Sequence, residues 1–194
     1  MLSTQDIEEI KVLHKEWFPI NYPQKFFDKI RKTEVIAIGC SYKVPVREEV
    51  WTADGKSEHK IVYESVMIGT IMSRVEREND RNTNALLKVG GNRGSSLSWL
   101  DWFTEKFSCQ SDYTSGRQAC YIMTIGVIDE CRRLGIGTKM LDYTIDLVER
   151  EFEECILIYL HVISYNKSAI RFYLGNGFHK YEVLKKHYCI DDVE

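Results

Sequence analysis

The order of hydrophobic patterns along the chain predicts a single α/β domain with a mixed, mostly antiparallel central sheet flanked by helices. Segments rich in β-branched residues alternate with segments whose apolar residues recur at helical intervals. The second half has the order strand, glycine-rich turn, helix, strand, helix. With 194 residues and 44% hydrophobic content, we expect residues 1–194 to form one domain with a substantial core.

Charge and cysteine content exclude several classes of protein. The formal net charge of −3 argues against broad electrostatic attraction to nucleic acid or anionic lipid, so any anion site must be local. None of the six cysteines forms a CxxC pair, and the N-terminus lacks the apolar core of a signal peptide. We therefore expect a cytoplasmic protein with reduced thiols. No segment approaches the roughly 18 apolar residues of a membrane span.

The first elements are predicted to be two helices. Residues 5–17 place apolar side chains at helical spacing, with Ser3 or Thr4 as a possible N-cap. A proline-containing loop follows, and residues 24–32 predict the second helix.

Two long segments rich in β-branched residues, 34–44 and 59–78, predict neighbouring antiparallel strands with a bend or bulge at Gly69. The connection 45–58 contains an Asp-Gly turn pair and is expected to be a mobile hairpin end. Residues 79–116 then contain several turn-forming clusters, which predicts a loop insertion. Its apolar stretch 97–103 favours a short helix docked on the domain.

The rest of the chain predicts the strand–helix–strand–helix part of the fold. Residues 121–128 predict a strand and 136–152 an amphipathic helix. The apolar run 155–164 is typical of a strand covered on both faces. Asn166 can cap a final helix that ends near Gly175.

The turn "RRLGIG" between strand and helix has the features of a phosphate site, because a helix N-terminus offers unpaired N–H groups and a positive dipole end. A P-loop requires Lys and then Ser or Thr after its last glycine, but Gly137 is followed by Thr-Lys. A dinucleotide-binding turn requires a third glycine where Met140 stands. The pattern that remains is R-x-x-G-x-G, formed by Arg132, Gly135 and Gly137.

This pattern, with "YIMTIGVID" before it and "YLHV" and "AIRFY" after it, resembles the coenzyme A site of the GNAT superfamily of N-acetyltransferases. The resemblance is close over residues 118–190 and looser over 5–76. With "WFPINYPQKFFDKI", it narrows to the catalytic subunits of the NatE and NatF protein N-terminal acetyltransferases. These modify proteins that begin with Met and a hydrophobic or amphipathic residue. The resemblance implies a GNAT fold with a long insertion before its fourth strand.

The resemblance also implies that acetyl-CoA is the acetyl donor and that no metal takes part. Main-chain groups of one strand would hold the pantetheine arm, and N–H groups of the turn would hold the pyrophosphate. The implied cofactor-binding residues are Ile125, Val127, Arg132, Arg133, Leu134, Gly135, Ile136, Gly137, Thr138, Asn166 and Tyr173.

By the same resemblance, Tyr121 and His161 would hold a water that deprotonates the substrate amine, and the Tyr173 hydroxyl would protonate or solvate the departing thiolate. Relatives often have paired tyrosines where this chain has Tyr188 alone, which leaves the peptide contacts on that side open. The implied substrate-binding residues are Phe18, Pro19, Ile20, Tyr22, Met123 and Tyr188.

The sequence is compatible with several alternatives. His161 could be a satisfied core histidine, Tyr173 a core aromatic, and Ile20 part of ordinary loop packing. The protein could also be a GNAT enzyme for lysine or small amines, or a noncatalytic coenzyme-binding subunit of a ribosome-associated complex. The insertion favours the NatF branch, whereas "YIMTIGV" and "RRLGIGTKML" favour NatE. Auxiliary Nat subunits or the ribosome are possible partners.

Overall fold

The computed structural model describes residues 3–18, 22–32, 34–51, 54, 56–77 and 117–184. The insertion 79–116, with its stretch 97–103, lies outside the described residues, as do Pro19, Ile20 and Tyr188. The elements are α1 (Thr4–Trp17), α2 (Gln24–Arg31), β1 (Ile36–Trp51), β2 (Ser57–Arg77), β3 (Gln118–Val127), the 3-10 turn η1 (Asp129–Cys131), α5 (Ile136–Glu151), β4 (Cys155–Leu160) and α6 (Lys167–Gly175).

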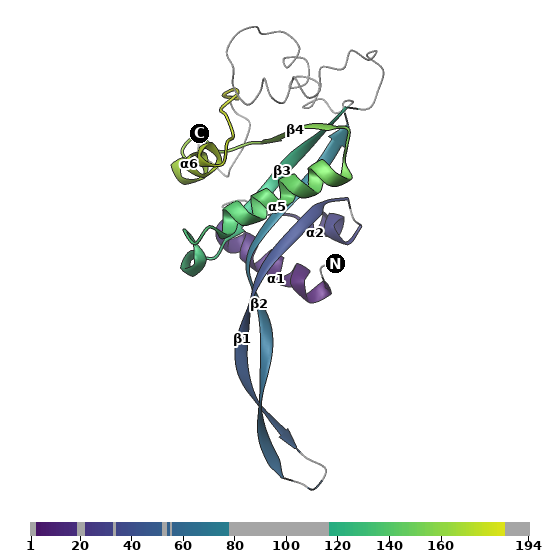
Figure 1. Cartoon of the computed structure of the whole chain (residues 1–194), viewed down its shortest axis with the longest axis vertical. Helices are drawn as coiled ribbons and strands as arrows, with labels where there is room; N and C mark the ends of the chain where they lie inside the picture. The colour runs from purple at the N-terminus through teal and green to yellow at the C-terminus, as the bar shows by residue number, and fades with distance from the viewer. Residues whose placement is uncertain are drawn as a thin grey trace.

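The strands of the described residues form one sheet in the order β1-β2-β3-β4 (Figure 1). β1 pairs antiparallel with β2, β2 antiparallel with β3, and β3 parallel with β4. The predicted mixed, mostly antiparallel sheet is therefore confirmed. Residues 78–116 precede β3, the strand that contains Tyr121, in the sequence.

Ser3, one of the two expected caps, is the N-cap of the first helix. The Ser3 hydroxyl accepts a hydrogen bond from the Asp6 N–H, and the Asp6 carboxylate accepts one from the Ser3 N–H. This reciprocal capping box satisfies two N–H groups that an uncapped helix would leave unpaired.

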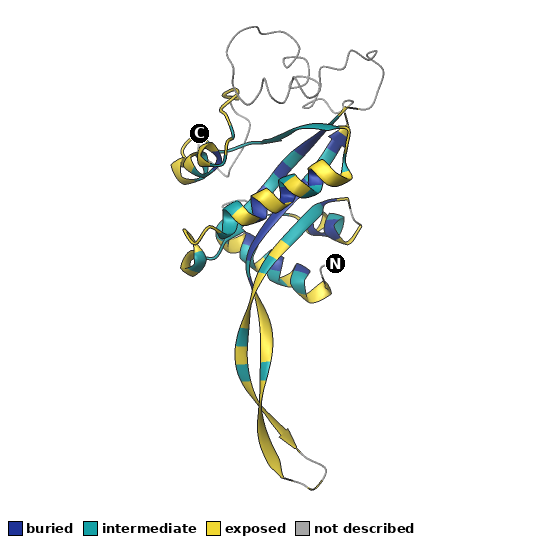
Figure 2. Ribbon diagram, viewed as in Figure 1, coloured by how far each residue is buried: buried dark blue, intermediate teal, exposed yellow. Residues whose placement is uncertain are grey.

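The β1–β2 hairpin projects well beyond the helices and is mostly exposed (Figures 1 and 2). The predicted extent of the hairpin end, residues 45–58, is wrong, because β1 continues to Trp51 and β2 starts at Ser57. Valine pairs such as Val46 and Val62 favour the extended conformation there. The expected bulge is confirmed, since the β1–β2 register skips Ile68, next to Gly69.

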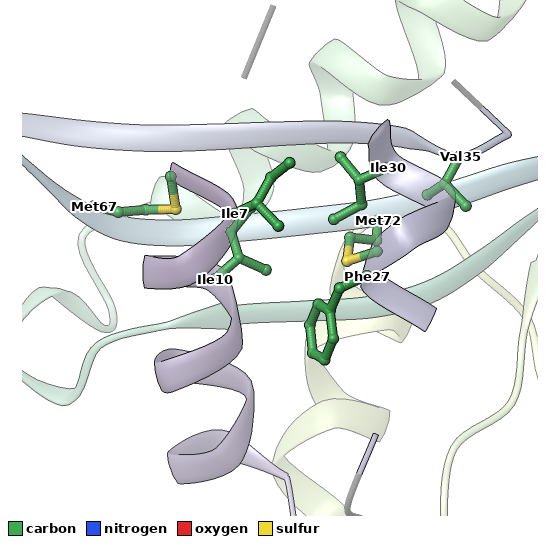
Figure 3. Packing of buried hydrophobic residues seen from close by; sticks show 7 residues of the cluster. All are labelled: Ile7, Ile10, Phe27, Ile30, Val35, Met67 and Met72. Atoms are coloured by element: carbon green, nitrogen blue, oxygen red, sulfur yellow. The ribbon is translucent and has the colours of Figure 1, made fainter. Parts of the chain in front are cut away.

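Helices cover both faces of the sheet. α1 and α2 pack against one face, where a buried cluster includes Met72 of β2 (Figure 3). The neighbouring residue, Ile71, belongs to a second cluster with side chains of α5 and α6. Successive strand residues point to opposite faces, so β2 contributes to both clusters. The first cluster consists of Ile7, Ile10, Phe27, Ile30, Val35, Met67 and Met72.

The β4 strand differs from its prediction in two respects. It ends at Leu160, so His161 lies directly after the strand. None of its residues is fully buried, because β4 lies at an edge of the described sheet.

Gly126 of β3 has the ring of Trp17 directly over its backbone. A Cβ atom at Gly126 would lie 2.0 Å from Trp17 Cε3. We expect Gly126→Ala to lower the free energy of unfolding by about 1–3 kcal/mol, because the indole must move. Gly175→Ala is the matched control, since a Cβ there meets nothing within 4 Å. Urea unfolding of both variants tests this, and equal stabilities would show that Trp17 does not rest on β3.

Candidate functional site

The strands β3 and β4 part in the middle of the sheet. Their last paired residues are Ile122 and Leu160, whereas β3 continues to Val127. On its other edge β3 remains paired with β2, but that register skips Met123, which forms a bulge. Within the described part of the chain, residues 123–127 therefore have no partner strand on the β4 side.

Tyr121 and His161 meet beside this gap. A hydrogen bond of 3.2 Å joins the Tyr121 hydroxyl and Nδ1 of His161. Their ring centroids are 5.4 Å apart, and both side chains are half-buried. The two candidate catalytic residues, 40 positions apart in the chain, thus form a hydrogen-bonded pair that water can reach.

Three residues that the sequence analysis missed surround this pair. The Arg74 guanidinium lies 5.7 Å from the ring centroid of Tyr121, a cation–π geometry. Arg74 also forms an ion pair with the buried Glu76 carboxylate, which accepts a 2.6 Å hydrogen bond from the Tyr159 hydroxyl. The Tyr159 ring lies 5.0 Å from that of Tyr121. The sequence signal for this group was an arginine and a glutamate two positions apart, and hence on one face, in a segment rich in β-branched residues.

The glycine-rich turn has the backbone of an anion site. Arg133 and Gly135 both have positive φ, 64° and 79°, and no side chain caps the start of α5. The Arg132 side chain donates a 3.0 Å hydrogen bond to the Val127 carbonyl and pairs with Asp129 at 2.7 Å. In this structure Arg132 thus braces the turn, while the first N–H groups of α5 receive no side-chain cap.

The other implied coenzyme residues have structural contacts of their own. The Asn166 side chain caps α6 by accepting a 3.0 Å hydrogen bond from the Ala169 N–H, as predicted. Tyr173 is buried, with ring contacts to Phe172 and Phe178. These contacts are those of a helix cap and of a core aromatic, and Tyr173 belongs to the buried cluster that includes Met140 and Leu141 of α5. The remaining implied coenzyme residues lie on β3, in the turn and in the first turn of α5: Ile125, Val127, Leu134, Ile136, Gly137 and Thr138.

Phe18 and Tyr22, two of the implied substrate residues, lie together at the end of α1. Their ring centroids are 5.9 Å apart in an edge-on arrangement, and both rings contact His14. Met123 packs at the margin of the buried cluster beneath them. Pro19, Ile20 and Tyr188 lie outside the described residues.

His14 anchors this aromatic group to the bulged strand. Its Nδ1 lies 2.9 Å from the Ile10 carbonyl and its Nε2 lies 3.0 Å from the Thr124 hydroxyl. Since a carbonyl only accepts, Nδ1 carries the proton and Nε2 accepts from Thr124. Burial lowers the pKa of His14 to about 4, despite the hydrogen bond to the Ile10 carbonyl, so the ring is neutral at pH 7. A histidine on the apolar stripe of a helix was the signal that the sequence analysis passed over.

Three further properties of the described residues concern a buried thiol, candidate metal ligands and membrane-spanning helices. Cys120 is fully buried, and burial raises the pKa of its thiol to about 12, so it remains protonated at neutral pH. Over the same residues, no group of three or more His, Cys, Asp or Glu side chains is placed to hold a metal ion. No helix there is long and apolar enough to span a bilayer.

Comparison with known proteins identifies relatives over the whole chain or over part of it. N-alpha-acetyltransferase 60 of Danio rerio is 26% identical over 195 residues, which cover 100% of this chain and 64% of that protein. N-alpha-acetyltransferase 50 of Danio rerio is 37% identical over 116 residues, which cover 57% of this chain and 64% of that protein. The chain thus spans less than two thirds of the length of these relatives.

Solved structures show the same fold. The crystal structure of Arabidopsis thaliana NAA60 in complex with a bisubstrate analogue has a TM-score of 0.63 at 19% identity, covering 98% of this chain and 87% of that one. Arabidopsis thaliana Naa50 in complex with a bisubstrate analogue has a TM-score of 0.56 at 20% identity, covering 98% and 88%. The model of the Acetyltransferase (GNAT) family matches residues 7–178. By this match, the chain is a member of the GNAT acetyltransferase family.

Proposed function

We propose that this protein is an acetyl-CoA-dependent enzyme that acetylates the α-amine of proteins beginning with Met and a hydrophobic or amphipathic residue. The observation that carries the proposal is the Tyr121–His161 hydrogen bond at the gap between β3 and β4. Membership of the GNAT family supports acetyl transfer, and the relatives named N-alpha-acetyltransferase support an N-terminal α-amine as acceptor.

The backbone of the gap and of the turn fits acetyl-CoA, which supplies an acetyl group activated as a thioester. The unpaired edge at 123–127 lets Ile125 and Val127 offer main-chain groups to the pantetheine arm, as an edge strand does to an added strand. At the turn, where Gly135 has a left-handed conformation, the N–H groups of the first turn of α5 would bind the pyrophosphate.

The proton released from the amine leaves through Tyr121 and His161. The attacking nitrogen forms the amide bond, the C–S bond breaks, and His161 accepts the proton through a water held by both side chains. An imidazole can accept a proton at neutral pH, which suits it to this role. The Tyr173 hydroxyl would protonate the thiolate, a modest contribution because a thiol pKa near 8.5 already makes departure easy.

The ordinary acidities of amines favour N-termini over lysine side chains. An α-amine with a pKa near 7.8 is roughly a quarter neutral at about pH 7.4, whereas a lysine with a pKa near 10.4 is about 0.1% neutral. This difference corresponds to roughly 3 kcal/mol before the enzyme contributes anything. The rate is then expected to come from positioning the amine against the thioester, without a covalent enzyme intermediate.

The acceptor pocket is proposed to lie at the end of α1. Phe18 and Tyr22 supply an apolar surface for the first two substrate residues, together with Pro19, Ile20, Met123 and Tyr188. The His14–Thr124 hydrogen bond connects this surface to the bulge beside Tyr121. The aromatic side chains of this apolar surface favour an unbranched apolar substrate residue such as the initiator Met.

A peptide panel tests the proposal. Wild-type protein is given acetyl-CoA and peptides that start with Met-Leu, Met-Lys or Ser, or that are acetyl-capped with an internal lysine. We expect preferential turnover of the Met-started peptides. Turnover of the capped lysine peptide alone would replace the proposal by a lysine acetyltransferase. Binding of acetyl-CoA without any turnover would instead indicate a noncatalytic subunit.

Glu76 is expected to position the catalytic pair. Glu76→Ala leaves the Arg74 guanidinium and the Tyr159 hydroxyl without this carboxylate, so we expect a loss of about 1–3 kcal/mol in the free energy of unfolding. We also expect a lower kcat, because the support of Tyr121 loosens. Glu76→Gln keeps an acceptor for Tyr159 and should retain more of both quantities. Urea unfolding and peptide kinetics measure these effects, with the exposed Glu149→Ala as the control. A kcat unchanged in Glu76→Ala would remove Glu76 from the site.

We further propose that this activity is cytoplasmic and that auxiliary Nat subunits or the ribosome bring the enzyme to its substrates. The absence of a CxxC pair and the inert, buried Cys120 are compatible with a reducing compartment. The preference between Met-Leu and Met-Lys peptides would assist in assigning the NatE or NatF branch. Within residues 1–194 we propose one catalytic domain, in which 79–116 is a loop insertion.

A further inference from the structure

The outer part of the β1–β2 hairpin, residues 41–51 and 57–66, is here called the arm. It extends away from the helices and is largely exposed on both faces (Figure 2). A two-stranded ribbon alone is only marginally stable in water, so the arm would gain stability from an additional strand. Its exposed large apolar side chains are Tyr42, Val50, Trp51, Ile61, Tyr63 and Val66.

The two edges of the arm differ in their capacity to accept a strand. β3 pairs with β2 only from Gly69 to Arg77, so among the described residues the β2 edge from Ser57 to Val66 has no neighbouring strand. The β1 edge contains Pro45, which has no N–H group to donate. The β2 edge of the arm contains no proline. The β2 edge is therefore the one open to strand addition.

The sequence of this edge is complementary to itself. Lys60 lies two residues before Val62 and Glu64 two residues after it. In an antiparallel pair of two β2 edges centred on Val62, Lys60 of each copy faces Glu64 of the other, and Ile61 faces Tyr63. Opposite charges and aromatic–β-branched pairs are the cross-strand pairs that stabilise sheets. Two-fold symmetry makes each pair occur on both sides of the axis.

Neighbouring registers lack this complementarity. A two-fold axis perpendicular to the sheet keeps each side chain on the same face of the sheet. Residues that face each other across the two strands must therefore be an even number of positions apart in the sequence, so the axis must pass through a residue. Centring on Ile61 sets Glu58 opposite Glu64. Centring on Lys60 or on Glu64 sets that charged side chain opposite its own copy, and centring on residue 63 pairs neither charge. Within this set, only the register centred on Val62 pairs both charges with opposite charges.

The β1–β2 pairing adds to this arrangement. Glu48 of β1 is the cross-strand partner of Lys60, so Lys60 would lie between Glu48 of its own chain and Glu64 of the second copy. At the centre, Val46 and Val62 of both copies would form a continuous apolar row. In the described residues, no ion pair within the chain uses Lys60 or Glu64.

We propose that the arm is a self-association surface and that its partner is a second copy of this chain. The two β2 edges join antiparallel about Val62 and produce a ribbon with the strand order β1-β2-β2-β1. The inference rests on the free edge, the proline on the other edge and the charge complementarity about Val62. It does not depend on the proposed enzymatic activity.

Sedimentation equilibrium of the full chain over a concentration series tests the proposal. We expect a reversible monomer–dimer equilibrium for the wild type. Lys60→Glu or Glu64→Lys sets like charges opposite each other on both sides of the axis, so the dissociation constant should rise at least about tenfold. An equimolar mixture of the two variants restores opposite charges in the mixed dimer and should associate about as tightly as the wild type.

The mixture also controls for folding, because a variant that had lost the arm structure would not recover association with its counterpart. Lys43→Glu changes the net charge as Lys60→Glu does but lies on β1, opposite Ser65, and should leave the dissociation constant unchanged. A wild type that stays monomeric at every concentration would overturn the proposal. A dimer that is indifferent to both charge reversals, or a mixture that fails to associate, would overturn it as well. Acetyl transfer should not change in either variant.

Discussion

His161→Ala is expected to lower kcat/KM for Met-started peptides by about 10²–10⁴-fold, the usual contribution of a positioned base. The physical reason is the 3.2 Å hydrogen bond between His161 Nδ1 and the Tyr121 hydroxyl, which fixes where the shared water would sit. Without the imidazole, the amine proton must leave to bulk water. Initial rates over a range of peptide concentrations give kcat and KM separately, and the loss should fall mainly on kcat.

Two comparisons make this result specific. Tyr121→Phe keeps the ring beneath Arg74 and removes the hydroxyl, so it should lower kcat with little loss of stability. His179→Ala, at an exposed position after α6, is the matched histidine control and should behave as the wild type. Acetyl-CoA at 100 times its dissociation constant should still stabilise each variant by about 2.7 kcal/mol. If His161→Ala binds acetyl-CoA and retains full turnover, His161 is a structural residue.

The second large effect is a loss of stability on mild acidification. The pKa of His14 is lowered to about 4 in the folded protein by burial, against an ordinary value near 6.5 for the unfolded chain. Between these two values the unfolded chain binds the additional proton, so stability rises with pH and is lost as the pH falls from about 6.5 to about 4. The loss from this group is expected to be about 2 kcal/mol between roughly pH 7 and pH 5.

Urea unfolding at each pH measures this slope. His14→Gln is expected to be less stable at pH 7, because it disturbs the contacts to Ile10 and Thr124, but its stability should be nearly flat over the same pH range. His179→Gln should keep the wild-type slope. A wild type whose stability does not change between pH 7 and pH 5 would show that the His14 ring titrates normally, and hence that α1 does not seal it from water.

Local patterns predicted most elements of the fold. The helix at Thr4–Trp17 follows from apolar spacing and a serine cap, and the turn before α5 follows from Gly135, whose left-handed backbone conformation favours glycine. The hairpin end was misjudged because the Asp-Gly turn pair drew attention to the tip, while valines on either side of it support strand. The exposure of β4 depends on which strands flank it, a tertiary property that an apolar run does not encode.

Some residues of the candidate site could likewise be predicted from local sequence, whereas others depend on contacts with distant parts of the chain. Tyr121 and His161 were identified by motif, and their contact then follows from the parallel pairing of Tyr121 with Tyr159, which places residue 161 beside residue 121. Glu76 was missed because its significance depends on burial and on Tyr159, 83 positions away. His14 was missed for the same reason, since its partner Thr124 lies 110 positions later in the chain.

The unpaired edge of β3 has a kinetic consequence. A coenzyme bound along residues 123–127 would occupy the place of a missing strand and would also form one wall of the acceptor pocket beside Tyr121. The acceptor peptide would then find its complete site only on the loaded enzyme. The order of addition should accordingly be compulsory, with acetyl-CoA first and the acetylated peptide leaving before free coenzyme A. In effect, the cosubstrate would serve as a removable part of the fold.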